Sequence, residues 1–378
     1  MNYAKYLITP LLMTIVTGYT MAGGLWMWAG FLFLVFVIVG GDALSYDDLS
    51  EPEFGHTWLL NIILYFTIPV LLLMLFVTAW MSGSEGHDLF GAGAAVYRYT
   101  GFDPFAARAA TGWYHLAGAI LGTGLAVAGY GTNVAHEFTH RTSDPAAMIA
   151  GRWLLAMSCN SDFSIEHVYG HHRFIGTKRD PATAYRGENV YSFILRSTVY
   201  GHISAWNLEA NRLRKKGLHI VSFRNRMLTG YAMSIAYAAF FYAAAGWPGV
   251  FVFFAQAAWA KVILEIVNYM EHYGLVRVEG EPVLPRHSWN TNKYLSSLIL
   301  YSLTRHSAHH EKGDLPFWKL KPYTAAPTMP FGYLTTIIIC LVPPLWKNVM
   351  APKLAEWDER YASPMEKQIL RDSERAAA

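Results

Sequence analysis

The sequence predicts an all-α integral membrane protein with six transmembrane helices and a cytoplasmic helical cap that carries a histidine-rich site. Three observations predict this class. Of the 378 residues, 53% are hydrophobic and 15% are charged, whereas soluble globular domains carry about 25% charged residues. Apolar runs of about 20 residues, the length that crosses a bilayer, recur along the chain. Nine of the 15 histidines lie in tight groups on the polar segments.

Six apolar runs are candidates for the transmembrane helices. The first two runs are short and meet at Gly23 and Gly24, which predicts a tight helical hairpin. A seventh run, 333–342, ends at Pro343 and Pro344. It is too short to span and is predicted to be an interfacial or re-entrant helix. The predicted spans are 5–20, 24–40, 58–81, 112–134, 228–246 and 249–267.

Basic residues set the predicted orientation, because Lys and Arg are retained on the cytoplasmic side of a membrane. Nearly all of them follow residue 112 and lie in 141–226 or after Arg277. We therefore expect these segments on the cytoplasmic side of a bacterial inner membrane, and the Gly-rich loop 82–111 outside. The net charge is only +3, and no basic run is interleaved with aromatic residues, which argues against a nucleic-acid partner.

The chain is expected to form a single domain in four consecutive parts. These are transmembrane helices one to four in 1–135, a cytoplasmic histidine-bearing segment in 136–227, transmembrane helices five and six in 228–268, and a second cytoplasmic histidine-bearing segment with the tail in 269–378. The two cysteines, Cys159 and Cys340, are too few and too far apart for a disulfide framework or a thiolate metal site. A metal would therefore be held by other ligands.

Histidines recur at helical spacing in four stretches, HEFTH, EHVYGHH, NYMEHYG and RHSAHH. Residues i and i+4 share one face of a helix, so His136 with His140, and His167 with His171, can each present two nitrogens to one metal. Adjacent imidazoles point about 100° apart on a helix and can reach a second ion. First-row metals take about four to six donors, so nine imidazoles predict two metals. The predicted ligands are His136, His140, His167, His171, His172, His272, His306, His309 and His310.

All-imidazole ligation suits Fe, Zn, Cu or Ni, which leaves several functions open. HEFTH matches the zinc-protease pattern with Glu137 as general base, but a protease leaves most of the other imidazoles unused. A non-catalytic haem or metal carrier that uses an intramembrane residue such as His115 is another alternative. Two irons with open positions can bind and cleave O2 and oxidise an unactivated C–H bond. This interpretation fits the number of ligands best.

Four motifs in this order, HEFTHR, EHVYGHH, NYMEHYGLVR and RHSAHH, resemble the histidine boxes of the membrane-bound diiron hydroxylases related to alkane 1-monooxygenase. That family includes the hydroxylase subunit of xylene monooxygenase and is distantly related to membrane fatty acid desaturases. The resemblance runs from about residue 112 to Tyr361. It implies that the predicted ligands hold two iron ions on the cytoplasmic side. It also implies that one atom of O2 is inserted into the terminal methyl group of a medium or long-chain n-alkane.

The resemblance further implies an electron supply from rubredoxin, which an NAD(P)H-dependent flavoprotein reductase reduces. The chain lacks the paired CxxC motifs of a fused rubredoxin, so we expect a separate donor, and a basic cytoplasmic face suits an acidic partner. The substrate stays open. RHSAHH and EHVYGHH resemble the alkane enzymes, whereas HEFTHR, Lys261, Glu265 and GLVR resemble the xylene enzyme, which hydroxylates the methyl group of an alkyl-arene. A membrane lipid desaturase is a further alternative.

Carboxylates beside the predicted ligands are candidates for tuning the reaction. Glu137, Glu166 and Glu271 are each adjacent in sequence to a histidine of the four stretches. Since neighbours on a helix diverge, each would orient an imidazole of another stretch by accepting its free ring N–H. Ordinary surface carboxylates are the alternative. Further candidates for the orienting role are Asp162, Asp180, His287 and Asn290.

Two ionisable residues, Lys261 and Glu265, occur at i and i+4 in the last predicted span. Ionisable groups are costly in lipid and usually face the protein interior. The two side chains can neutralise each other, or they can serve a proton path or a redox partner.

Overall fold

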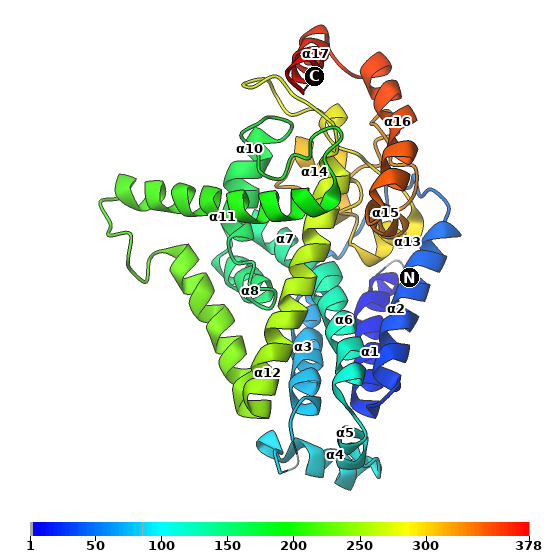
Figure 1. Cartoon of the computed structure of the whole chain (residues 1–378), viewed down its shortest axis with the longest axis vertical. Helices are drawn as coiled ribbons and strands as arrows, with labels where there is room; N and C mark the ends of the chain where they lie inside the picture. Colours follow the sequence, from blue (N-terminus) through cyan, green and yellow to red (C-terminus); the bar gives the residue numbers. More distant parts are fainter. Residues whose placement is uncertain (1–2, 85, 378) are drawn as a thin grey trace.

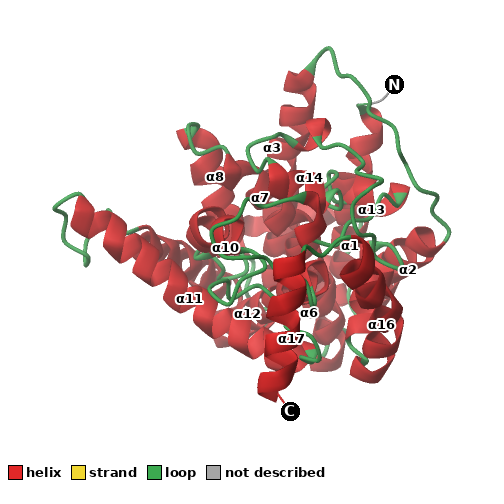
Figure 2. Ribbon diagram, turned by 90° about the horizontal axis from the view of Figure 1, so that it is seen from above, coloured by secondary structure: helices red, strands yellow, loops and turns green. Residues whose placement is uncertain are grey.

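The computed structural model describes residues 3–84 and 86–377, and its regular structure in these ranges is helical (Figures 1 and 2). Within them, two isolated bridges, Asp47 with Lys293 and Asn290 with Thr328, are the only extended pairings. Long helices form the lower half of the molecule in Figure 1, and the histidine-bearing helices lie above them. The all-α class predicted from the sequence is confirmed.

The helices follow the order of the predicted segments. The lower half contains α1 (Ile8–Ala22), α2 (Trp26–Ala43), α3 (Thr57–Met81), α4 (Ala92–Thr100), α5 (Pro104–Ala109), α6 (Trp113–Ala126) and α12 (Arg226–His272). The upper half contains α7 (Asn133–His140), α8 (Pro145–Ala156), α9 (Phe163–Glu166), α10 (His172–Phe174), α11 (Val190–Lys215), α13 (Tyr294–Ile299), α14 (His306–Glu311), α15 (Tyr333–Cys340), α16 (Pro343–Arg360) and α17 (Pro364–Ala377). Two π-helical turns, η3 (Val127–Thr132) and η4 (His167–His171), join α6 to α7 and α9 to α10. Short 3-10 turns are η1 (Ala4–Leu7), η2 (Leu89–Gly91), η5 (Pro285–His287) and η6 (Phe317–Lys319).

Three helices of the described chain, α2, α3 and α12, are long and apolar enough to cross a membrane. The last of them, α12, covers both of the final predicted spans. The backbone leaves helical geometry between these spans at Gly246, where φ is 66° and ψ is −150°. The chain reverses there, and α12 is drawn in Figure 1 as two limbs. A positive φ of this kind favours glycine. The other predicted spans, in α1 and α6, are shorter helices of 15 and 14 residues, so the count of six spans stays a prediction.

The segment predicted to be a Gly-rich loop, 82–111, contains the two short helices α4 and α5. The prediction of a plain loop was therefore wrong. The Asp103 carboxylate accepts hydrogen bonds from the backbone N–H groups of Phe105 and Ala106, and Pro104 occupies the first turn of α5. An Asp cap followed by Pro is a common helix start, so the signal was present in the sequence.

Small residues let the long helices approach closely. A Cβ atom on Gly118 of α6 would lie 2.7 Å from the backbone nitrogen of Trp28 in α2. A Cβ atom on Gly124 would lie 2.7 Å from the carbonyl oxygen of Gln256 in α12. Such small-residue contacts are typical of helix pairs in membranes, where close backbone packing replaces the hydrophobic effect. As a result α6, which leads into the first histidine stretch, is packed between α2 and α12.

Buried polar contacts fix the last histidine stretch to the bundle. The Arg305 guanidinium donates to the carbonyl oxygens of Leu320, Asp48 and Ser50 at 2.7, 3.1 and 3.0 Å. The residue after Arg305 begins α14, so these bonds set where that helix starts. The loop between α2 and α3 thereby helps to position the histidines of α14.

Candidate metal centre

Four histidine-bearing elements meet above the long helices. They are α7, the turn η4 with the start of α10, the upper end of α12, and α14 (Figure 1). All nine predicted ligands lie in this cluster, and only His140 and His172 are partly accessible to solvent. The structure therefore brings together every imidazole that the sequence predicted as a metal ligand.

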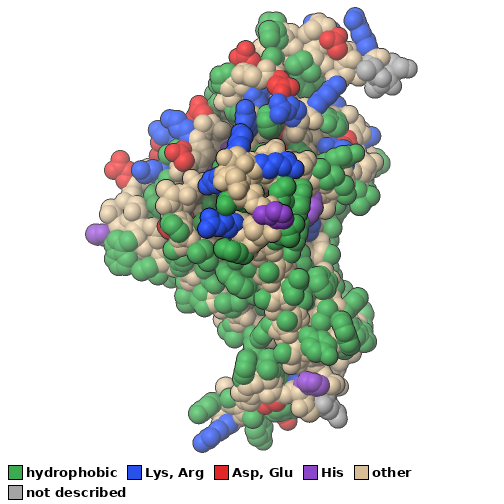
Figure 3. All heavy atoms as spheres, turned by 90° about the vertical axis from the view of Figure 1, so that its left-hand side faces the viewer, with side chains coloured by type: hydrophobic (Ala, Val, Ile, Leu, Met, Phe, Trp, Pro, Cys, Tyr) green, Lys and Arg blue, Asp and Glu red, His purple; other side chains and the backbone are tan. Residues whose placement is uncertain are grey.

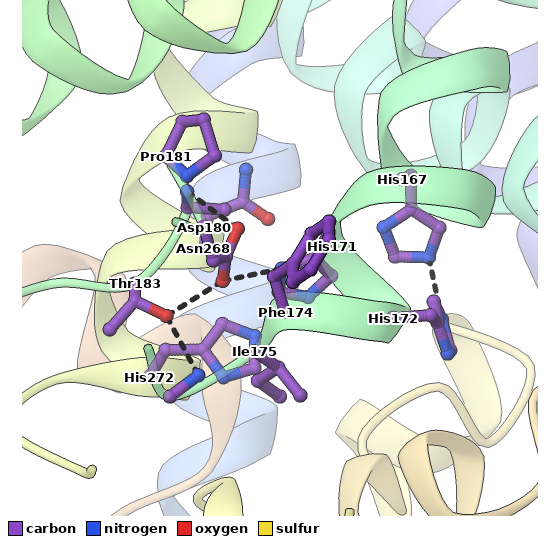
Figure 4. Close-up of polar contacts among 12 residues, drawn as sticks. His167, His171, His172, Phe174, Ile175, Asp180, Pro181, Thr183, Asn268 and His272 are labelled. Atoms are coloured by element: carbon purple, nitrogen blue, oxygen red, sulfur yellow. Dashed lines mark hydrogen bonds and ion pairs between the residues drawn. The ribbon is translucent and has the colours of Figure 1, made fainter. Parts of the chain in front are cut away.

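A π-helical turn divides the second histidine stretch. Its i to i+5 hydrogen bonding places residues five apart on one face, in place of residues four apart. The Nε2 atoms of His167 and His172 lie 3.1 Å apart, and Figure 4 shows His171 pointing away from them. The predicted sharing of one metal by His167 and His171 is therefore wrong, because it assumed α-helical spacing throughout.

The first group of ligand atoms contains five imidazoles from three stretches. Their ligand nitrogens all lie within 4.8 Å of one another. The Nε2 atom of His309 is 2.9 Å from that of His136 and 2.9 Å from that of His172. The five-histidine group consists of His136, His140, His167, His172 and His309.

The second group contains four imidazoles and one carboxylate. Nε2 of His310 lies 2.8 Å from Nε2 of His306 and 3.3 Å from Nε2 of His171. Nε2 of His306 lies 3.3 Å from Nε2 of His272 and 3.3 Å from Oε2 of Glu271. Two overlapping sets of ligand atoms share His272: one adds His171 and His310, and the other adds Glu271 and His306. Because His306 also lies next to His310, we call His171, His272, His306 and His310 together the four-histidine group.

The spacing of these nitrogens fits metal ligation. At a metal–nitrogen distance of about 2.1 Å, neighbouring ligand nitrogens lie roughly 3.0 to 3.4 Å apart in octahedral or tetrahedral geometry. The observed separations of 2.8 to 3.3 Å are close to this range. Nε2 of His140 is buried, and it has no hydrogen-bond partner among the described residues. Such a nitrogen needs a partner of another kind, and a metal ion supplies one.

Adjacent histidines belong to different groups. His309 lies in the five-histidine group and His310 in the four-histidine group, although their ring centroids are only 5.4 Å apart. The same division separates His171 from His172. The sequence-based expectation that neighbouring imidazoles reach two different ions agrees with this geometry.

Burial favours the neutral form of the imidazoles in the five-histidine group. It lowers the pKa of His140 to about 3 and holds the pKa of His136, His167, His172 and His309 well below the usual value, with further lowering from the neighbouring imidazoles. A neutral imidazole keeps a lone pair free, which is the form that binds a metal.

One imidazole of the four-histidine group has a carboxylate behind it. The Nδ1 atom of His171 lies 2.9 Å from Oδ2 of Asp180 (Figure 4). That oxygen also accepts from Thr183 Oγ1 at 2.7 Å, and Oδ1 accepts from the Ala182 N–H at 3.0 Å. Burial acts to lower the pKa of His171, but the carboxylates around it, Asp180 first among them, raise it overall. This arrangement orients the ring and increases the basicity of Nε2.

Glu271 stands beside the ligand nitrogens rather than behind them. Its Oε2 atom faces the Nε2 atom of His306, and its Oε1 atom accepts a hydrogen bond of 2.7 Å from the Tyr333 hydroxyl. The carboxylate can thus act as a further ligand beside His272 and His306. Sequence reasoning missed Tyr333, because it lies 62 residues away in a short apolar helix.

The other two carboxylates named from the sequence have different partners. Glu137 binds Arg141 at 2.9 Å and accepts from the Phe317 N–H at 3.2 Å. Glu166 accepts from Ser204 Oγ at 3.3 Å, and burial together with the charge of Asp180 raises its pKa to about 8. Neither forms a hydrogen bond to an imidazole in the described chain, so the orienting role predicted for them is not found there.

Of the further candidates for the orienting role, one contacts a histidine of the cluster and three have other partners. Asp180 reaches a histidine of the cluster, as described above. Asp162 lies 4.0 Å from His202, His287 binds Glu366 at 2.8 Å, and the backbone N–H of Asn290 donates to the Pro327 carbonyl oxygen at 2.9 Å. These contacts are outside the two histidine groups. Asp180 could have been ranked higher, since the Asp-Pro pair in DPAT predicts a turn that fixes the carboxylate.

The ionisable pair of α12 is formed as the spacing predicted. Lys261 Nζ lies 2.7 Å from Oε1 of Glu265 and 2.7 Å from Oδ1 of Asn160. The pair borders a small polar cavity that His167 and His171 also line. Mutual neutralisation therefore accounts for its presence in an apolar helix.

An apolar cavity of about 70 Å³ reaches the imidazoles from the side of the long helices. Its walls come from α2, α6, η3, α12, α13 and α15. His136, His167 and His306 form part of the lining, so the cavity touches both histidine groups. The apolar lining includes Ile38, Leu125, Ile263, Val267, Leu300 and Leu303. An apolar molecule in this cavity would contact imidazoles of both groups.

Known proteins with similar sequences indicate the family of this chain. The family described as fatty acid desaturase matches residues 111–338. Alkane 1-monooxygenase 1 of Pseudomonas aeruginosa is 40% identical over 272 residues, covering 71% of this chain and 70% of that protein. Alkane 1-monooxygenase 2 of the same organism is 35% identical over 332 residues, covering 86% and 81%. The hydroxylase component of xylene/toluene monooxygenase from Pseudomonas putida is 35% identical over 238 residues, covering 62% and 64%.

The helical fold, the apolar helices and the clustered imidazoles define a histidine-rich oxygenase of the fatty acid desaturase class. Within that class, the chain belongs to the alkane 1-monooxygenase family. The three long apolar helices and these relatives indicate a membrane protein. The family is one of non-haem iron enzymes, and the two histidine groups offer donors of the kind that iron accepts.

Proposed function

We propose that this enzyme hydroxylates the terminal methyl group of a medium or long-chain n-alkane at a histidine-ligated diiron centre. One observation carries the proposal: two adjacent groups of buried imidazoles line one apolar cavity. The reaction consumes the hydrocarbon, O2, two electrons and two protons, and it yields a 1-alkanol and water. When bound, two irons supply the Lewis acidity and redox capacity that this reaction needs.

The chain itself performs the binding and positioning steps. The five-histidine group and the four-histidine group would each hold one iron, and Asp180 keeps His171 in the orientation that ligation needs. The apolar cavity excludes water and directs one end of a hydrocarbon toward His136 and His306. Glu271 also lines the cavity, where the Tyr333 hydroxyl donates to it, and burial raises its pKa to about 8.

Electrons come, in this proposal, from a separate rubredoxin that an NAD(P)H-dependent flavoprotein reductase recharges. The six-span arrangement in the bacterial inner membrane, with the histidine groups on the cytoplasmic side, belongs to the same proposal. So does the division of a single domain into the parts 1–135, 136–227, 228–268 and 269–378. The basic residues after residue 112 support this orientation.

A second candidate is hydroxylation of the methyl group of an alkyl-arene. The likeness to the xylene/toluene monooxygenase component favours it. Both substrates present a methyl group on an apolar body, so one cavity suits either chemistry. Desaturation of a membrane lipid is a third and weaker candidate, supported by the name of the matching family.

Metal analysis and product analysis of the purified enzyme test the proposal together. Octane, hexadecane, xylene and a phospholipid would be supplied in turn with rubredoxin, its reductase, NADH and ¹⁸O2. We expect about two iron atoms per chain, as nine imidazoles require, and labelled 1-octanol or 1-hexadecanol. Zinc in place of iron, or an oxidised product without ¹⁸O, would overturn the proposal. Labelled methylbenzyl alcohol alone would select the second candidate.

The cavity can be tested separately from the metal. Ala128 lies in η3 and lines the cavity. A phenylalanine at this position should fill the space, so we expect Ala128→Phe to keep its iron and to lose the longest alkanes first. An unchanged chain-length profile in this variant would show that substrate binds elsewhere.

A further inference from the structure

The helix α11 and the first limb of α12 form an arm that projects from the molecule, at the left of Figure 1. The segment 214–224 at its end, here called the arm tip, reads RKKGLHIVSFR. It contains four basic residues and no acidic residue. Its apolar side chains are unusually exposed, since Val221 is 71% and Phe223 is 82% accessible. Such residues on a soluble surface would cost free energy unless something covers them.

The charges of the arm tip are not neutralised by the protein. Just beside it, Arg212 and Arg226 bind the buried carboxylate of Glu209 at 2.6 and 2.8 Å. In the described chain, by contrast, no ion pair involves the basic residues of the arm tip itself. These residues are Arg214, Lys215, Lys216 and Arg224. The arm tip thus presents four positive charges for an external partner.

The covalent connection sets the depth of the arm tip relative to a membrane. The first limb of α12 runs from Arg226 to the reversal at Gly246, which is about 30 Å of helix at 1.5 Å per residue. This length equals the hydrocarbon core of a bilayer, about 30 Å. Trp247 beside the reversal is 73% accessible, and tryptophan is enriched at membrane interfaces. With Gly246 placed at one boundary on this ground, the first limb brings Arg226 to the other. The arm tip ends at Arg224, two residues before Arg226, and is therefore at the level of the lipid headgroups.

The surface above the apolar region agrees with this depth. Figure 3 faces the end of the arm and shows Lys and Arg side chains gathered directly above a broad hydrophobic band. The α11 helix that leads to the arm tip also has an exposed apolar stripe, with Leu195 71%, Val199 54% and Ile203 47% accessible. Residues four apart lie on one face of a helix. An apolar helix face that ends in basic residues is typical of segments lying in a membrane interface.

We propose that the arm tip binds the anionic headgroups of phospholipids, with Phe223 and Val221 inserted below the phosphates. Each Lys or Arg near an anionic surface favours association by roughly fivefold, and four such residues act together here. Phe223 supplies an apolar anchor for the lipid chains. Free phosphate has no apolar part, so it cannot make this contact. The proposal rests on the membrane placement of α12 and not on the reaction, so it can fail while the proposed function holds.

A label at the arm tip tests this proposal in the full-length protein. The exposed Cys159 would be replaced by Ala, and Val221→Cys would carry an environment-sensitive fluorophore, since Cys340 is buried. The protein would be placed in nanodiscs of phosphatidylcholine, with or without phosphatidylglycerol. We expect blue-shifted emission and quenching by brominated lipid. Both should grow with phosphatidylglycerol and weaken in high salt.

Two variants serve as matched controls. The double charge reversal Lys215→Glu with Lys216→Glu should abolish the effect of phosphatidylglycerol. The same reversal at Arg371 and Arg375 in α17, which are also exposed, should leave it intact. Emission that is insensitive to phosphatidylglycerol and to both reversals would overturn the proposal. A blue shift that depends on protein concentration and is not quenched by brominated lipid would also overturn it, because a second copy of the chain would then cover the arm tip.

Discussion

The two histidine groups differ in what supports them. In the described chain, the five-histidine group has imidazoles as the side-chain partners of its ring nitrogens. The four-histidine group is supported by two carboxylates, Asp180 behind His171 and Glu271 beside His306. The first group therefore depends on close packing of rings, whereas the second depends on charge and hydrogen bonding. A substitution that disturbs packing should therefore weaken metal binding mainly in the five-histidine group. A substitution that removes a charge should weaken it mainly in the four-histidine group.

Removing a single imidazole should have the largest effect and test the division directly. His309 and His310 are adjacent but belong to different groups. We expect His309→Ala and His310→Ala each to retain about one of two irons, because each group holds one ion, and to form no O2-dependent product. Elemental analysis and a whole-cell conversion assay measure this. The exposed His219 provides the control, since His219→Ala should keep both irons and full turnover. Complete iron loss in both variants would show one shared centre.

Removing the carboxylate behind His171 should have the next largest effect. Asparagine at position 180 keeps the size of the side chain but loses its charge. We expect Asp180→Asn to reduce iron affinity or turnover about 10- to 100-fold, as is usual for groups that orient a metal-bound histidine. The loss should be confined to the four-histidine group.

The matched control for Asp180→Asn is Glu137→Gln. Glu137 is adjacent in sequence to His136, but its partners are Arg141 and the Phe317 backbone. Iron content measured by titration with a chelator should therefore be unchanged in this variant. Equal losses of iron from Asp180→Asn and Glu137→Gln would show that the hydrogen bond between His171 and Asp180 has no special role in metal binding.

A packing change should affect the five-histidine group. A Cβ atom on Gly313 would lie 2.8 Å from Cε1 of His172 and 3.3 Å from Cε1 of His140. We expect Gly313→Ala to displace these rings and to weaken iron binding about tenfold in that group alone, because ligand positions must be kept within about 0.5 Å. Mössbauer spectra of the two irons separate the sites. Identical changes at both sites would contradict the expectation.

The smallest effect is expected at Tyr333. Its hydroxyl donates to Glu271 and lies outside the ligand set. Tyr333→Phe removes one hydrogen bond to this buried carboxyl group, worth about 0.5 to 1.5 kcal/mol. We expect both irons to remain and turnover to fall about tenfold. Loss of iron from Tyr333→Phe would show that the hydroxyl is needed for ligation itself.

Much of the fold was readable from the sequence because membrane helices have a strong local signal. The apolar run predicted at 58–81 corresponds to α3, Thr57–Met81. The last two runs are the limbs of α12. The helices in 82–111 were missed because their apolar character is weak, although Asp103 and Pro104 mark the start of one of them.

The sequence alone indicated which imidazoles could meet, because ligand type and helical spacing are local properties. The number of ions stays a prediction. The tertiary structure alone decided how the nine histidines divide, since the π-helical turn at 167–171 exchanges the partners of His171 and His172. It also brought Asp180 and Tyr333 to the site. These contacts join segments far apart in the chain, and no local pattern encodes a long-range contact.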